Sequence, residues 1–241
     1  SETVWRQGDK YRVPRIAFVN KLDRVGADFD RVVRMIRERL AARPVALQLP
    51  IGAEDRFVGV VDLLRERSIV WDDSSLGERF EEGPVPEELR DAVAEARERV
   101  VEAVADFDEA VAQRYLGDEP VPADLLRKAL RQATLGLHVV PVLCGAAFRN
   151  KGIQPLLDAI LDYLPSPLDV PPMEGHDPES GAVLRRKPDD NEPFAALVFK
   201  LMTDPHVGRL VYVRIYSGTL SASQQVFNSS ERKPERIGKL V

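Results

Sequence analysis

Cysteine is almost missing from this chain: Cys144 is the single one in 241 residues. One cysteine excludes an internal disulfide, and without several partner ligands it also excludes a zinc-finger site. The sequence lacks the run of roughly 18 apolar residues that a membrane helix needs, and it begins with no signal peptide. These absences predict a cytoplasmic protein with no membrane partner.

The net charge of the chain is also small. The 34 basic and 39 acidic residues give a formal charge of −5, without the basic excess typical of nucleic-acid-binding domains. The three histidines, His138, His176 and His206, are scattered without ligand spacing, so no metal site is predicted. The chain does have 44% hydrophobic and 30% charged residues, a globular balance that excludes a disordered or fibrous protein.

The apolar patterns predict two strand–loop–helix units. Residues 15–19 form a short apolar run, and helical spacing over 29–40 follows it. The same order recurs downstream, with a strand over 139–144, a loop over 145–152 and a helix over 153–164. Between these units the patterns predict short strands over 44–49, 57–62 and 68–71, then helices over 86–116 and 122–133.

The character of the chain changes after residue 164. Seven prolines lie between positions 165 and 193 with little apolar periodicity, which predicts a linker. Strand-like runs over 194–202, 210–216 and 225–228 then predict an all-β region. We therefore expect an α/β domain followed by a β domain.

The sharpest local signal is Asn20-Lys21-Leu22-Asp23, directly after the first predicted strand. Open α/β sheets bind their ligands at this carboxyl end of the strands. A carboxylate at Asp23 can accept two hydrogen bonds from guanine, one from the ring N–H and one from the exocyclic amine, whereas adenine lacks this pair of donors. The alternative is that the loop only starts a helix, which Asp23 or Asp28 would cap.

A second loop of small residues, Gly145-Ala146-Ala147, follows the downstream strand. Small residues let backbone N–H groups approach a base carbonyl closely. The alternative is that these residues serve tight packing of helix against sheet. Cys144, at the end of an apolar strand, is predicted to be a core residue and not a nucleophile.

Seven stretches along the chain carry a family resemblance: ETVWRQ (2–7), PRIAFVNKLDR (14–24), GADF (26–29), QLPIG (48–52), CGAAFRNKG (144–152), DYLPSP (162–167) and DPHVGRL (204–210). Together they resemble bacterial elongation factor G, a family of ribosome-dependent GTPases. The resemblance implies an internal fragment with an α/β fold, namely a partial P-loop GTPase sheet with an inserted α+β subdomain, followed by part of an all-β barrel. The implied segments are 1–41 and 139–167 for the GTPase domain, 42–138 for the insert, 168–193 for the linker and 194–241 for the second domain.

The length of the chain between the two loops agrees with such an insert. Between Asp23 and Cys144 lie 120 residues, whereas a simple strand–helix–strand return needs roughly 30. Release-factor GTPases and tetracycline-resistance ribosomal protection proteins share the Asn-Lys-x-Asp loop and a β second domain. The long insertion and the proline-rich residues 165–172 favour elongation factor G.

The resemblance implies GTP or GDP as the ligand and assigns its contacts to Asn20, Lys21, Asp23, Gly145, Ala146 and Ala147. No catalytic or metal-binding residue is assigned, because the 241 residues contain no G-x-x-x-x-G-K-[ST] phosphate loop. The family would carry that loop, and with it the Mg²⁺ site, upstream of Ser1. We therefore expect this piece alone not to hydrolyse GTP. Ala146 departs from the family pattern, which usually has a serine that braces the loop.

The partners that the resemblance implies are the ribosome, including a ribosomal stalk protein that the charged helix over 87–114 could dock, and the expected state is a monomer. The implied activity of the full-length protein is GTP hydrolysis that promotes translocation of tRNA and mRNA. A function of another class stays open: a ribosome-associated binding module with a degenerate guanine site that hydrolyses nothing.

Overall fold

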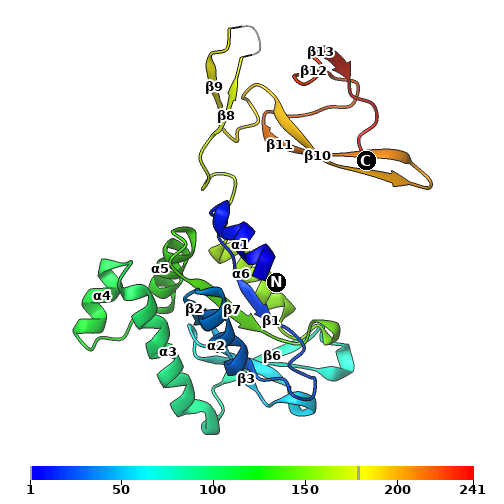
Figure 1. Cartoon of the computed structure of the whole chain (residues 1–241). Helices are drawn as coiled ribbons and strands as arrows, with labels where there is room; N and C mark the ends of the chain where they lie inside the picture. Colours follow the sequence, from blue (N-terminus) through cyan, green and yellow to red (C-terminus); the bar gives the residue numbers. More distant parts are fainter. Residues whose placement is uncertain (1, 178–179) are drawn as a thin grey trace. The chain divides into compact units, whose positions relative to one another are not determined.

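The computed structural model describes residues 2–177 and 180–241, which divide into two units, residues 1–164 and 165–241 (Figure 1). Unit 1 combines helices with two sheets. Its elements are α1 (Glu2–Lys10), β1 (Ala17–Val19), α2 (Phe29–Leu40), β2 (Pro44–Ala46), β3 (Gln48–Ile51), β4 (Gly59–Asp62), β5 (Arg67–Trp71), β6 (Phe80–Pro84), α3 (Arg90–Ala105), α4 (Glu109–Leu116), α5 (Ala123–Leu135), β7 (Val140–Cys144) and α6 (Ile153–Tyr163).

A three-stranded parallel sheet, in the order β1-β7-β2, lies at the centre of unit 1. Val19 is in register with Cys144 where β1 and β7 end. Because parallel strands point the same way, the loops that follow them leave from the same edge of the sheet. The Asn20–Asp23 loop and the Gly145–Ala147 loop are therefore neighbours, although more than 120 residues separate them in sequence.

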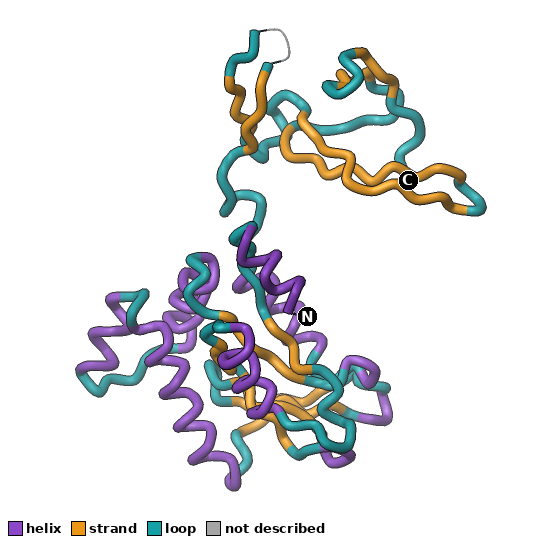
Figure 2. The backbone as a smooth tube through the Cα atoms, viewed as in Figure 1, coloured by secondary structure: helices purple, strands orange, loops and turns teal. Residues whose placement is uncertain are grey.

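Both faces of this sheet are buried. Along β7 the side chains alternate, so that Leu143 joins one apolar cluster while Val142 and Cys144 join the other. The first cluster includes residues of α3, α5 and α6, and the second includes Phe29 and Ile36 of α2. Figure 2 shows these helices in purple around the orange strands. The strand ends are thus held by a core on each side.

A four-stranded antiparallel sheet, β3-β4-β5-β6, adjoins the parallel one. The predicted single strand over 44–49 is wrong, because β2 pairs with β7 and the chain then enters the second sheet as β3. Leu47 lies between the two and donates its N–H to the Val142 carbonyl at 2.9 Å. The insert that the resemblance implies, starting at residue 42, would therefore include β2, which is a strand of the parallel sheet. The meander also gains the exposed edge strand β6, which its polar sequence did not reveal.

The predicted continuous helix over 86–116 is also wrong. The chain forms a short 3-10 turn, then α3, and breaks at residues 106–108 before α4. Asp108 has extended backbone angles, and its carboxylate accepts the Val111 N–H at 3.0 Å. This side-chain cap satisfies an amide that a continuous helix would bond internally, so the helix restarts there.

Unit 2 is built from three antiparallel hairpins. Their strands are β8 (Met173–His176), β9 (Val183–Arg186), β10 (Ala195–Asp204), β11 (Gly208–Ser217), β12 (Gln225–Asn228) and β13 (Lys233–Arg236). The segment over 168–193, predicted as a linker, contains the β8–β9 hairpin, which the sequence patterns did not predict. Its strands carry cross-strand polar pairs such as Glu174 with Arg185, at 2.7 Å, in place of an apolar alternation.

The predicted order, an α/β domain followed by a β-rich region, is confirmed. Within the parts of the chain that the structure describes, no helix has the length and apolar character needed to cross a membrane.

Candidate functional site

Asn20 joins the two loops at the end of the parallel sheet. Its side-chain oxygen Oδ1 accepts the N–H of Lys21 at 2.8 Å and the N–H of Ala147 at 2.9 Å. Lys21 has a left-handed backbone, with φ of 65°, which turns the chain sharply after β1. Asn20 and Lys21 are both exposed. This exposed amide side chain thus links the two loops, together with the backbone bond from the Leu22 N–H to the Gly145 carbonyl at 3.1 Å.

Asp23 keeps its carboxylate free of any helix-capping role. Asp28 caps α2, where its Oδ1 accepts the Arg31 N–H at 2.9 Å. The carboxylate of Asp23 instead forms an ion pair with Arg149, with 3.3 Å between Oδ2 and Nε. The Asp23 side chain is 13% exposed and that of Arg149 is 49% exposed. The capping alternative therefore applies to Asp28 and leaves Asp23 for another role.

The amides of the second loop differ in their partners. Gly145 donates its N–H to the Val19 carbonyl at 3.0 Å, and Ala146 donates to the Lys151 carbonyl at 2.9 Å. The first bond joins the loop to the end of β1, and the second lies within residues 145–152. The Ala147 N–H donates to the exposed Asn20 side chain, so it is the amide of the three that an incoming acceptor can share or take over.

Glycine is required at both ends of the longer loop over 145–152, which contains Gly145–Ala147. A Cβ at position 145 would lie 2.2 Å from the Lys151 carbonyl oxygen, and Gly152 has φ of 88°. A side chain at either position would force the loop open. Close approach of the loop's own backbone therefore accounts for the glycine at 145, which differs from the packing of helix against sheet that one sequence interpretation proposed.

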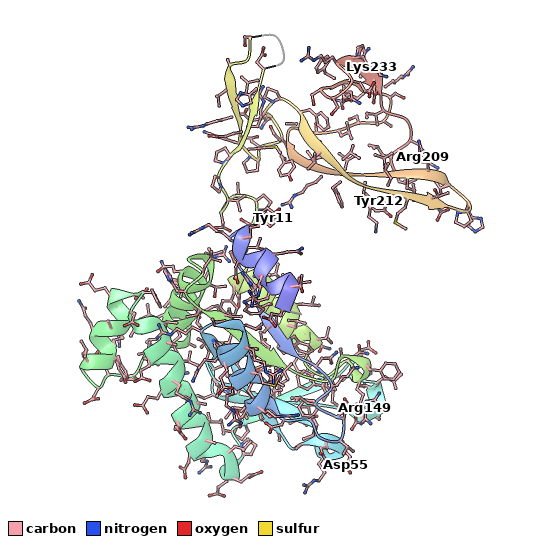
Figure 3. The ribbon with its side chains drawn as sticks, viewed as in Figure 1. Tyr11, Asp55, Arg149, Arg209, Tyr212 and Lys233 are labelled. Atoms are coloured by element: carbon pink, nitrogen blue, oxygen red, sulfur yellow. The ribbon has the colours of Figure 1, made fainter. Side chains whose placement is uncertain are left out.

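Charged residues outside the predicted set also hold these loops. Lys151 is 1% exposed, and its Nζ donates to the Phe57 carbonyl at 3.2 Å and pairs with Asp73 Oδ1 at 2.8 Å. The Glu54 Oε1 accepts the Gly26 N–H at 2.7 Å. Figure 3 labels Arg149 on the second loop and Asp55, the neighbour of Glu54, on the connection between β3 and β4. The sequence did not indicate Glu54, Asp73, Arg149 or Lys151, because charged residues are common and nothing local marks which of them contact the loops.

Cys144 lies beneath the second loop as a core residue, as predicted. It is fully buried, and burial raises the pKa of its thiol, so the sulfur stays protonated and unreactive. Its N–H donates to Gln48 Oε1 at 3.1 Å. Across residues 2–177 and 180–241, no group of three or more His, Cys, Asp or Glu side chains is placed to hold a metal ion.

The arrangement offers a carboxylate with two acceptor oxygens and, on the neighbouring loop, one backbone N–H donor. A planar ligand with two adjacent donors and one acceptor fits this set, and the Watson–Crick edge of guanine carries that combination. Adenine has an amine and a ring acceptor on the same edge and would leave a carboxylate oxygen without a donor.

Comparison with known proteins agrees with this chemistry. The family model described as the elongation factor Tu GTP binding domain matches residues 1–166, and the model described as elongation factor G domain 2 matches residues 193–241. A protein of Thermus thermophilus with a crystal structure is similar over 98% of this chain, at 27% sequence identity and a TM-score of 0.75. The match covers 32% of that protein, so this chain spans about a third of its length.

Proposed function

Because this chain belongs to the family of the elongation factor Tu GTP-binding domain, a family of translational GTPases, we propose that its two loops read the guanine base of GTP and GDP. The observation that carries the proposal is the bridge from Asn20 to Ala147, which holds the Asp23 loop beside the second loop. In the complex, the Asp23 carboxylate accepts the two guanine N–H groups, and the base carbonyl shares the Ala147 N–H with Asn20 Oδ1.

The other predicted residues take supporting roles in this proposal. Lys21 lies in the sharp turn after β1, and its aliphatic stem covers one face of the base. Gly145 and Ala146 shape the second loop through bonds to Val19 and Lys151. With alanine at position 146, the loop lacks a hydroxyl there. Arg149 Nε lies 3.3 Å from Asp23 Oδ2, where it competes with the base for that oxygen.

The 241 residues supply the base-reading part of the nucleotide site and not the part that handles phosphate. They contain no G-x-x-x-x-G-K-[ST] sequence, whose backbone amides and lysine would hold the phosphates and whose hydroxyl would hold Mg²⁺. We therefore propose that GTP hydrolysis belongs to the full-length protein and that residues 1–241 alone do not catalyse it.

For the full-length protein we propose the role of an elongation factor G, a cytoplasmic monomer that promotes translocation of tRNA and mRNA on the ribosome. The match of residues 193–241 to elongation factor G domain 2 supports this role over that of other translational GTPases. The long segment between the two loops supports it as well. Within that segment the proposed docking surface for a ribosomal stalk protein is the charged region over 87–114, which includes α3 and most of α4. It carries ion pairs such as that of Arg99 with Glu95.

The test uses the full-length protein. We expect it to bind GDP in preference to ADP and to hydrolyse GTP faster when ribosomes are added. A protein that binds ribosomes but neither guanine nucleotide would contradict the proposal and favour the binding module with a degenerate site. Binding of GDP without hydrolysis on ribosomes would leave base reading intact and contradict the enzymatic role.

A further inference from the structure

We propose that the four-stranded sheet β3–β6 is a positioning device for the guanine loops, with Lys151 and Asp73 as its central residues, and that it slows nucleotide release. The inference rests on the proposed function, because it concerns how the same site is held together. Its basis is a set of contacts that tie each guanine loop to a different connection of this sheet.

The first tie joins the Asp23 loop to the connection between β3 and β4. Glu54 donates its backbone N–H to the Leu22 carbonyl at 3.0 Å, while its Oε1 accepts the Gly26 N–H at 2.7 Å. The two bonds bracket Asp23 on both sides in sequence. Glu54 has φ of 56°, a conformation that costs free energy in a residue with a side chain and is retained because these bonds hold it.

The second tie joins the loop over 145–152 to the connection between β5 and β6. Lys151 pairs with Asp73, and Asn150 donates its Nδ2–H to the Leu76 carbonyl at 3.0 Å. The backbones also approach closely, since a Cβ at Gly77 would lie 2.1 Å from the Arg149 carbonyl oxygen. This glycine has φ of 77° and lets the connection lie directly against the guanine loop.

Lys151 links the two connections to one another. Its ammonium group donates to the Phe57 carbonyl, just before β4, and pairs with Asp73, just after β5. A buried ammonium group that loses its partners pays a large desolvation cost, so Lys151 resists movement away from the sheet. Its own carbonyl accepts the Ala146 N–H, next to the amide that reads the base. Movement of the sheet connections is therefore transmitted to the guanine contact.

Loosening this assembly should speed nucleotide release without changing which base is chosen. Release requires the two loops to separate from the base, and the ties to the sheet oppose that separation. The choice of base depends on the Asp23 carboxylate, which neither Lys151 nor Asp73 touches. Faster release with unchanged base preference is thus the signature that separates positioning from recognition.

The experiment measures dissociation of a fluorescent GDP analogue from the full-length protein and its Asp73→Asn variant. Asp73 is 66% exposed, so the variant folds, and the neutral amide weakens the hold on Lys151. The matched control is Glu82→Gln, which neutralises a half-exposed acid of the same sheet that pairs with Arg65 at 3.0 Å. We expect about fivefold to tenfold faster release from Asp73→Asn, in the usual range for coupled sites, and less than twofold change in the control.

Two further readouts distinguish positioning from a general loss of stability. Amide hydrogen exchange over residues 145–152 should accelerate in Asp73→Asn and not in Glu82→Gln, whereas a general loss of stability would accelerate exchange throughout unit 1. In a Lys151→Met background, adding Asp73→Asn should produce no further increase in release rate, because the pair is already lost.

Release from Asp73→Asn at the rate of the control, in a protein that binds GDP, would overturn the positioning role and leave the proposed function standing. A loss of guanine preference in Asp73→Asn would also overturn it, because the residue would then act on recognition. Failure of the unaltered protein to bind GDP would overturn both proposals.

Discussion

The two loops of the candidate site are built in opposite ways. The first, from Asn20 to Asp23, offers exposed or half-buried side chains as its functional groups. The second, from Gly145 to Ala147, offers a backbone amide, and the buried Lys151 holds it from behind. Side-chain groups for recognition can therefore be predicted from residue types, whereas a backbone donor depends on the packing beneath it.

The sharpest way to break the second loop is Gly145→Ala. A Cβ would lie 2.2 Å from the Lys151 carbonyl oxygen and 2.8 Å from Phe18 Cζ, so the loop must shift. We expect a loss of roughly 2 kcal/mol in the free energy of unfolding, as for other overpacked sites, measured by urea denaturation. Gly175→Ala is the matched control, since a Cβ there meets nothing within 4 Å. Equal stability of the two variants would contradict the packing argument.

The bridge between the loops is tested by Asn20→Ala. Loss of Oδ1 leaves the Lys21 and Ala147 amides without their partner, so the loops should lose their fixed spacing. A lost hydrogen bond of about 1 to 1.5 kcal/mol corresponds to roughly tenfold weaker GDP binding, measured by titration calorimetry. Asn228→Ala, in unit 2, is the control and should bind normally. Unaltered GDP affinity in Asn20→Ala would show that the hydrogen bonds of Asn20 do not contribute to nucleotide binding.

A smaller effect on GDP affinity is expected at position 146, where this chain has alanine and the family pattern usually has serine. Ala146→Ser restores a hydroxyl at a site that is 1% exposed, beside a backbone amide already bonded to Lys151. We expect the affinity for GDP to change by less than about tenfold, because one added hydrogen bond contributes modestly. Fluorescent nucleotide titration measures it, and a larger shift would show that the missing hydroxyl controls the site.

The ion pair of Arg149 with Asp23 predicts the smallest effect. Guanine needs both carboxylate oxygens, and Arg149 Nε already lies 3.3 Å from Oδ2. Removing this competitor by Arg149→Gln should tighten GDP binding about twofold to threefold, the scale of a half-exposed ion pair. Arg24→Gln controls for the loss of a positive charge near the first loop. Weaker binding in Arg149→Gln than in Arg24→Gln would mean that the arginine helps to bind nucleotide.

Residue types and strand order were enough to predict the Asn20–Asp23 loop and the Gly145–Ala147 loop at one sheet edge, because both loops follow apolar strands. They did not predict Lys151, since its contacts with Phe57 and Asp73 form only when the connections of the β3–β6 sheet fold against it. The helix break before Asp108 was missed because the apolar spacing continues through it. The β8–β9 hairpin was missed because its strands are polar and exposed.

The most direct test of base reading compares GDP with xanthosine diphosphate on the full-length protein carrying Asp23→Asn. Xanthine replaces the guanine amine with a carbonyl, which pairs with the amide N–H of the new asparagine. We predict that GDP binding falls roughly a hundredfold and that xanthosine diphosphate binds better than GDP. Asp28→Asn, in which asparagine still caps α2, should keep the preference for GDP. Retention of that preference in Asp23→Asn would contradict the claim that Asp23 reads the base.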